Sequence, residues 1–182
     1  MPSEFGVLTL EGEKDQFREA EDRKKCANIA LKSAKELDLK GYCGIDLVIN
    51  DECFFIESNP RLTTSFVGLS STINQKLAEL FVKKIVEERP ISSPSLENFS
   101  RISIPRVEKD VETESEKLTE LKQIPEIISP PYLVNGKVKE GSPIFLAVAT
   151  GESFEEAEDK IKEVINEAIN LLGIDKDAVT WA

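Results

Sequence analysis

Two short segments carry the residues whose chemistry is most specific. Asp46 lies inside the apolar run Ile45–Ile49, and Glu57, Asn59 and Arg61 follow a second apolar run. A carboxylate inside an apolar run costs free energy unless it has partners. Magnesium prefers oxygen ligands, so two carboxylates and an amide predict a magnesium site, with a guanidinium beyond it that could clamp a phosphate or acyl phosphate. The predicted metal ligands are Asp46, Glu57 and Asn59.

The three predicted ligands meet only if the strands pair correctly. Apolar residues at 42–49 and 53–56 predict a β-hairpin with a two-residue turn at Asn50–Asp51. This turn would place Asp46 opposite Phe55 and diagonal to the second carboxylate, roughly 7 to 8 Å away at the backbone. Side chains alternate faces along a strand, so all three ligands would point the same way, a spacing that suits a two-metal site. A one-residue slip would separate them.

A simpler interpretation competes with the metal site. An acidic strand end followed by Asn59 and Pro60 is also typical of an ordinary solvated turn. Asp46 argues against this alternative, because a turn does not explain an aspartate within the preceding apolar strand.

Helices are expected on both sides of the hairpin. Apolar residues recur at helical spacing from 17 to 37, between mostly charged positions. A loop is expected over Pro60–Leu69, followed by a helix over 72–88 that begins with a capping box formed by Thr72 and Gln75.

The remainder of the chain predicts a smaller unit. Residues 101–107 could form a strand, while the highly charged residues 108–122 are expected on the surface with no assigned structure. Residues 144–149 predict a buried strand, and a third helix should follow a capping box at Ser153 and Glu156 and end near Gly173.

These elements predict an α+β fold, in which an antiparallel sheet packs against helices and a small strand–helix subdomain follows. The expected division is a metal-binding lobe over residues 1–88, a Pro- and Ser-rich linker over 89–98 and a small α+β subdomain over 99–182.

Composition narrows the classes of partner. The chain has 34 acidic and 23 basic residues, and its net charge of -11 argues against binding to nucleic acid. No apolar run approaches the roughly 18 residues of a membrane span, so no membrane partner is expected. Because the sequence lacks histidine, catalysis would depend on carboxylates, amides, basic groups and metal.

The cysteines indicate a compartment. Cys26, Cys43 and Cys53 form no CxxC motif and lie within or beside apolar patterns, where a thiol usually behaves as a small hydrophobic group. This usage favours a reducing, cytoplasmic location.

At Gly41–Val48 and Glu57–Leu69 the sequence resembles the ATP-grasp superfamily, carboxyl-terminal part, and within it the tyramine–glutamate ligase group. The resemblance implies that the three predicted ligands hold magnesium against ATP, and that Arg61 is catalytic and faces the transferred phosphoryl group. It also implies that three hydroxyls line the substrate side, although hydroxyls that satisfy the loop backbone are an equal alternative. These residues are Thr63, Thr64 and Ser65.

The leading hypothesis for function is an ATP-dependent carboxylate–amine ligase that acts through an acyl phosphate on small carboxylate and amine substrates. ATP-grasp enzymes normally have upstream regions that bind the nucleotide, so we expect the chain to need another polypeptide or a second copy to complete the site. A non-catalytic binding or regulatory module is the main alternative, and a piece of a longer protein is a third possibility. Apolar surface left open in such a core would favour self-association.

Overall fold

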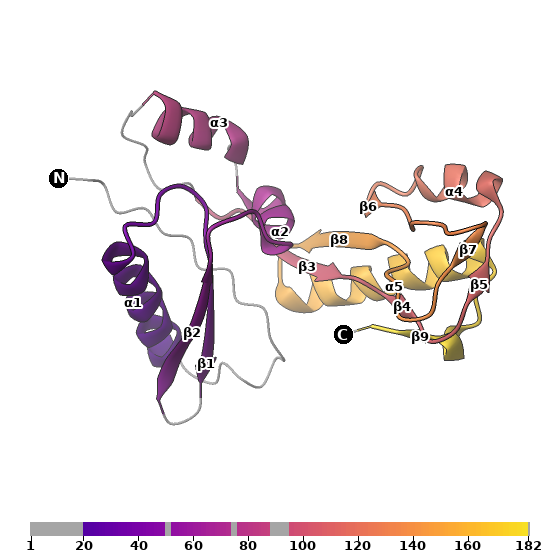
Figure 1. Ribbon diagram of the computed structural model, residues 1–182, viewed down its shortest axis with the longest axis horizontal. Helices are drawn as coiled ribbons and strands as arrows, with labels where there is room; N and C mark the ends of the chain where they lie inside the picture. Colours follow the sequence, from indigo (N-terminus) through magenta and orange to yellow (C-terminus); the bar gives the residue numbers. More distant parts are fainter. Residues whose placement is uncertain (1–19, 50–51, 74–75, 88–94, 182) are drawn as a thin grey trace. The chain divides into compact units, whose positions relative to one another are not determined.

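The computed structural model describes residues 20–49, 52–73, 76–87 and 95–181 (Figure 1). The chain divides into two compact units, Met1–Ser95 and Leu96–Ala182. Both units combine antiparallel strands with packed helices, which confirms the predicted α+β class. No helix in the described ranges has the length and apolar character needed to cross a membrane.

The first unit is built around one helix and one hairpin. Helix α1 (Ala20–Glu36) packs against the antiparallel strands β1 (Gly44–Ile49) and β2 (Cys53–Asn59), and Figure 1 shows it lying beside them. The predicted helix and hairpin are therefore confirmed over the described residues. Gly41, with φ +81°, turns the chain between α1 and β1 in a conformation that favours glycine.

The segment after the hairpin differs from the prediction. Helix α2 (Ser65–Thr72) begins inside the expected loop Pro60–Leu69, so the loop prediction was wrong over its second half. Phe66 and Leu69 lie one helical turn apart and share a small apolar cluster, which explains why a helix forms there.

The predicted capping box at Thr72 was also wrong. Thr72 is the last residue of α2, and its hydroxyl donates to the Leu69 carbonyl at 3.0 Å, while Gln75 lies outside the described residues. The expected single helix is instead α3 (Leu77–Phe81), which continues as a π-helical turn over Val82–Val86. Lys76, at the N-cap position of α3, makes no side-chain capping hydrogen bond.

The second unit contains a three-stranded antiparallel sheet in the order β3-β8-β6, against which α5 (Phe154–Leu172) packs. Its strands are β3 (Phe99–Ser103), β8 (Leu146–Gly151) and β6 (Ile127–Ser129). The remaining elements are the pairs β4 (Arg106–Val107) with β9 (Val179–Thr180) and β5 (Val111–Glu112) with β7 (Lys137–Val138), helix α4 (Ser115–Leu121) and the 3-10 turn Lys176–Ala178.

Two predictions in this unit need correction. The expected strand 101–107 is divided into β3 and β4 at Pro105, because proline has no N–H to donate to a ladder. The charged stretch 108–122 is not all surface: it forms β5 and α4, and the side chain of Leu121 at the end of α4 is fully buried. The strand expected at 144–149 begins at Leu146.

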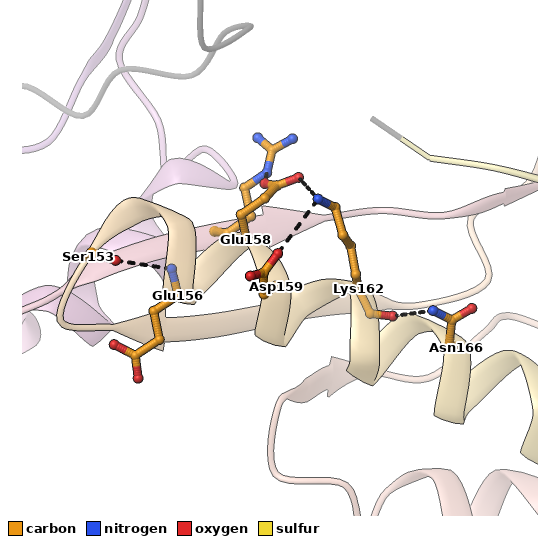
Figure 2. A network of polar contacts seen from close by, with 7 residues as sticks. Ser153, Glu156, Glu158, Asp159, Lys162 and Asn166 are labelled. Atoms are coloured by element: carbon orange, nitrogen blue, oxygen red, sulfur yellow. Dashed lines mark hydrogen bonds and ion pairs between the residues drawn. The ribbon is translucent and has the colours of Figure 1, made fainter.

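Helix α5 begins and ends as the sequence predicts. The Ser153 hydroxyl accepts a hydrogen bond from the Glu156 amide at 3.1 Å, and Gly173 ends the helix with φ +71°. Figure 2 shows this cap and, along the exposed side, Lys162 between Glu158 and Asp159, with Nζ–O distances of 3.3 and 4.0 Å.

The inner side of α5 supplies much of the core of the second unit. Ile165 and Ile169 are fully buried and pack with strand residues such as Ala147. The other large, almost fully buried side chains of this cluster are Val107, Leu121, Val138, Ile144, Phe145 and Leu172.

Truncating Ile165 should therefore destabilise the second unit. We expect Ile165→Ala to lower its free energy of unfolding by about 2 to 5 kcal/mol through lost burial and the cavity that remains. Chemical denaturation followed by circular dichroism measures the change. Glu163→Ala, at an exposed position of the same helix, should change it by less than about 0.5 kcal/mol; equal losses in both variants would contradict this core.

Candidate functional site

The hairpin turn sets the first part of the register. Ile49 pairs with Cys53, and not with Glu52 as a two-residue turn requires. The connection is therefore one residue longer than predicted, although Asn50 and Asp51 themselves lie outside the described residues. By itself this one-residue slip would move the predicted ligands on β2 to the opposite face from those on β1.

A β-bulge then shifts the register again. Leu47 pairs with Phe55, whereas Asp46, the residue before it in β1, pairs with Glu57. Ile56 is therefore the extra residue on β2. The prediction that Asp46 faces Phe55 was wrong. The two carboxylates are directly opposite one another, and not diagonal.

The two irregularities cancel in their effect on side-chain direction. Together they displace β2 by two residues relative to the predicted pairing, and side chains alternate with a period of two. Asp46, Glu57 and Asn59 consequently point to one face, as the sequence predicts, through a different register.

The three side chains are in direct contact. Nδ2 of Asn59 donates to Oδ2 of Asp46 at 3.2 Å and to Oε1 of Glu57 at 3.0 Å. Like charges placed opposite each other on neighbouring strands repel, and the amide donor between them offsets this repulsion. We call these three residues the acid–amide cluster.

The donor set of the acid–amide cluster fits a hard cation. Two carboxylates and one amide offer oxygen ligands and leave coordination positions for water and phosphate oxygens. Because an amide carries an acceptor as well as donors, the Asn59 side chain can present oxygen to a cation if it turns over. Among the described residues no three Cys, Asp or Glu side chains gather where they could hold a metal ion, and the acid–amide cluster itself contributes two carboxylates.

Arg61 follows the cluster through a tight turn. Its amide donates to the Asn59 carbonyl at 2.8 Å, a γ-turn centred on Pro60. The guanidinium is exposed, and its Nη1 approaches the Leu62 carbonyl at 3.4 Å. Arg61 is thus two residues beyond the cluster with its charge in solvent.

Three hydroxyls hold the next part of the loop. Tyr42 Oη lies 2.7 Å from Thr63 Oγ1 and 3.0 Å from Ser65 Oγ, and these two oxygens are 2.6 Å apart. Three hydroxyl protons suffice for three mutual bonds, so Thr63 and Ser65 bond within this triad. Thr64 is exposed and makes no capping bond at the start of α2. That Thr63, Thr64 and Ser65 contact a substrate stays a prediction.

Tyr42 was missed by the sequence analysis. Its ring contacts Phe66 edge-on, with centroids 5.4 Å apart, and Phe81 at 6.3 Å, and it packs against the cluster of Leu69 and Leu77. Tyr42 thereby joins the loop that carries Arg61 to the apolar core of the first unit. The available signal was weak, since Tyr42 looks like an ordinary strand residue in the sequence.

Comparison with known proteins agrees with the resemblance noted in the sequence. Residues 6–65 match the family model for the ATP-grasp domain. A curated relative, tyramine–L-glutamate ligase of Methanocaldococcus fervens, is 45% identical over 62 residues, which are 34% of this chain and 21% of the relative. The aligned part thus spans about a fifth of that enzyme.

Solved structures show that the fold is shared over most of the chain. N5-carboxyaminoimidazole ribonucleotide synthetase of Thermotoga maritima matches with a TM-score of 0.58 and 15% identity, over 90% of this chain and 43% of that one. N5-carboxyaminoimidazole synthase of Aspergillus clavatus, solved with ADP and 5-aminoimidazole ribonucleotide, matches with a TM-score of 0.56 and 18% identity, over 83% of this chain and 42% of that one. This chain therefore spans less than half of either structure.

The hydroxyl triad gives a stability prediction. Tyr42→Phe keeps the ring contacts but removes one hydroxyl, and we expect the free energy of unfolding of the first unit to fall by about 1 kcal/mol. Tyr132→Phe is the matched control, because Tyr132 is 82% exposed. Urea denaturation measures both; a Tyr42→Phe protein as stable as the control would show that the triad does not anchor the loop.

Proposed function

We propose that the chain forms the magnesium-binding part of an ATP-dependent carboxylate–amine ligase. The match of residues 6–65 to the ATP-grasp domain model and the similarity in fold to a solved ribonucleotide synthetase support this proposal. One observation carries this proposal: Asp46 and Glu57 are directly opposite each other and both bonded to Asn59. An ordinary solvated turn would not require this convergence of two carboxylates on one amide.

Asp46, Glu57 and the amide oxygen of Asn59 would hold the cation. When bound, magnesium would offset the negative charge of the ATP phosphates, which otherwise opposes attack by an anion. The cation would also take the place of the Asn59 amide group between the two carboxylates and so offset their mutual repulsion.

Arg61 would act on the transferred phosphoryl group. Its side chain is exposed, and the γ-turn fixes its backbone close to the cluster. A guanidinium presents a planar set of donors that matches phosphate oxygens. These features support our proposal that Arg61 stabilises charge on the γ-phosphate.

The proposed reaction has two steps. A substrate carboxylate attacks the γ-phosphorus of ATP, ADP leaves, and an acyl phosphate forms. The substrate amine then attacks the acyl carbon, inorganic phosphate leaves, and an amide bond results. Tyramine and L-glutamate are the substrates named for the relative, and a small amine and an amino acid of this kind are our proposed substrate class.

The face of the hairpin that carries the acid–amide cluster has exposed apolar side chains beside the cluster. Val48 and Phe54 pair on this same face and are 52% and 51% exposed, while α1 packs against the hairpin. An apolar surface beside the phosphate site suits either a nucleotide base or a second protein surface. We propose that an upstream ATP-grasp polypeptide or a second copy completes the site, in the cytoplasm.

Magnesium binding provides the first test. Titrating MgCl₂ into the isotopically labelled chain should shift the amide NMR signals of β1 and β2, and Glu57→Gln should weaken the affinity about tenfold or more, because it removes a charged ligand. Glu52→Gln, at the exposed far end of the hairpin, should leave the affinity unchanged. Equal affinities for the two variants would overturn the assignment of the cluster.

Catalysis provides the second test. We expect the chain, mixed with an ATP-grasp amino-terminal polypeptide, to release ADP only when magnesium and the carboxylate are present, and to turn over repeatedly only when the amine is present as well. Arg61→Ala should lower this rate about 10²- to 10³-fold, since a group that stabilises the transition state is lost. Arg106→Ala, an exposed arginine of the second unit, should leave it within about twofold.

The outcomes separate the two candidate functions. Magnesium binding without ADP release in any combination would favour a non-catalytic binding module. Absence of both would contradict the ligase proposal altogether.

A further inference from the structure

Two thiols meet where α1 packs against β2. The Sγ atoms of Cys26 and Cys53 lie 3.0 Å apart, although 27 residues separate them in the sequence. Both are free thiols in the structure. The sequence analysis treated them as separate hydrophobic residues, since no CxxC spacing connects them.

The contact lies on the face of the hairpin opposite the acid–amide cluster. Cys53 pairs with Ile49, and the next pair along the strands, Val48 with Phe54, points to the cluster's side. Because α1 supplies Cys26, this helix covers the thiol face.

The two sulfurs differ in access to solvent. Cys26 is 1% exposed, and burial raises the pKa of its thiol to about 12, with a further contribution from the hydrogen bond with Cys53. Cys53 is only half-buried. A reagent from solution would therefore reach Cys53 first, and Cys26 would react only with the sulfur beside it.

We propose that Cys26 and Cys53 form a redox-sensitive dithiol, which a small-molecule disulfide oxidises to an intrachain disulfide that ties α1 to β2. Cys53, as the thiolate, attacks one sulfur of the oxidant, and the other half of the oxidant leaves as a thiolate. Cys26 then loses its proton to water and attacks Sγ of Cys53, which releases the second half. The two protein thiols are oxidised, and the oxidant is reduced to two thiols.

The geometry favours this second step. A disulfide bond is about 2.05 Å long, so the sulfurs need to approach by only about 1 Å. Cys43, which precedes β1, is half-buried and takes no part in this contact. It is therefore an internal control for the reactivity of an ordinary thiol in the same unit.

The disulfide would close a loop that contains the whole of β1 and the hairpin turn. It would restrict the unfolded chain and so stabilise the first unit, while the acid–amide cluster stays open on the other face. The redox state would thus control how firmly the helix supports the hairpin.

The test is to treat the full chain with oxidised glutathione and to digest it without reduction for mass spectrometry. We expect a peptide pair linked through Cys26 and Cys53, and an intact protein lighter by two hydrogen atoms. The thermal midpoint of the first unit should rise by roughly 5 to 10 °C and return with dithiothreitol. Cys43→Ala should keep both effects, whereas Cys53→Ser and Cys26→Ala should each abolish them.

A glutathione adduct that persists on Cys53 while Cys26 remains open to alkylation after unfolding would overturn the proposal. Linkage through Cys43, or between two chains, would overturn it as well. Because Cys53→Ser changes a half-buried position by one atom, it keeps the test decisive if Cys26→Ala does not fold.

Discussion

The alternation of side chains along a β-strand is the constraint on which the candidate site depends. Asp46 and Glu57 come from different strands, so they can share a ligand only if the pairing of β1 with β2 keeps both on one face. The longer turn alone would break this condition, and the bulge at Ile56 restores it. Bulges are frequent beside active sites, because one extra residue can redirect the side chains that follow it.

The surroundings of the hairpin follow from this arrangement. One face meets α1 through Cys26 and Cys53, which leaves the other face for the acid–amide cluster. The loop beyond the cluster is tied to the core of the first unit by Tyr42, and the γ-turn at Pro60 delivers Arg61. The hairpin thus has a supported side and an open side, an arrangement suited to a site that binds a charged ligand and is covered by another surface.

Local signals in the sequence predicted much of this structure. Ser153 and Gly173 define the ends of α5 because caps depend on neighbouring residues alone. The convergence of Asp46, Glu57 and Asn59 could be predicted because Asp46 is out of place in an apolar strand unless it has partners.

The remaining features depend on contacts between distant residues. Nothing in its own sequence marks Ile56 as a bulge, since it looks like any other strand residue. Helix α2 was missed because its serines are typical of a loop, while Phe66 and Leu69 form a helix only with partners such as Leu77 to pack against. The thiol contact and the hydroxyls around Tyr42 likewise join residues that only the fold brings together.

The most direct measurement of the central claim is the strand pairing itself. Cross-strand nuclear Overhauser effects between backbone protons of the labelled chain report which residues lie opposite one another. The structure predicts contacts between Asp46 and Glu57 and between Leu47 and Phe55, with Ile56 unpaired. Contacts between Asp46 and Ile56 would show a hairpin without the bulge, in which Asp46 and Glu57 point to opposite faces, and would contradict the account.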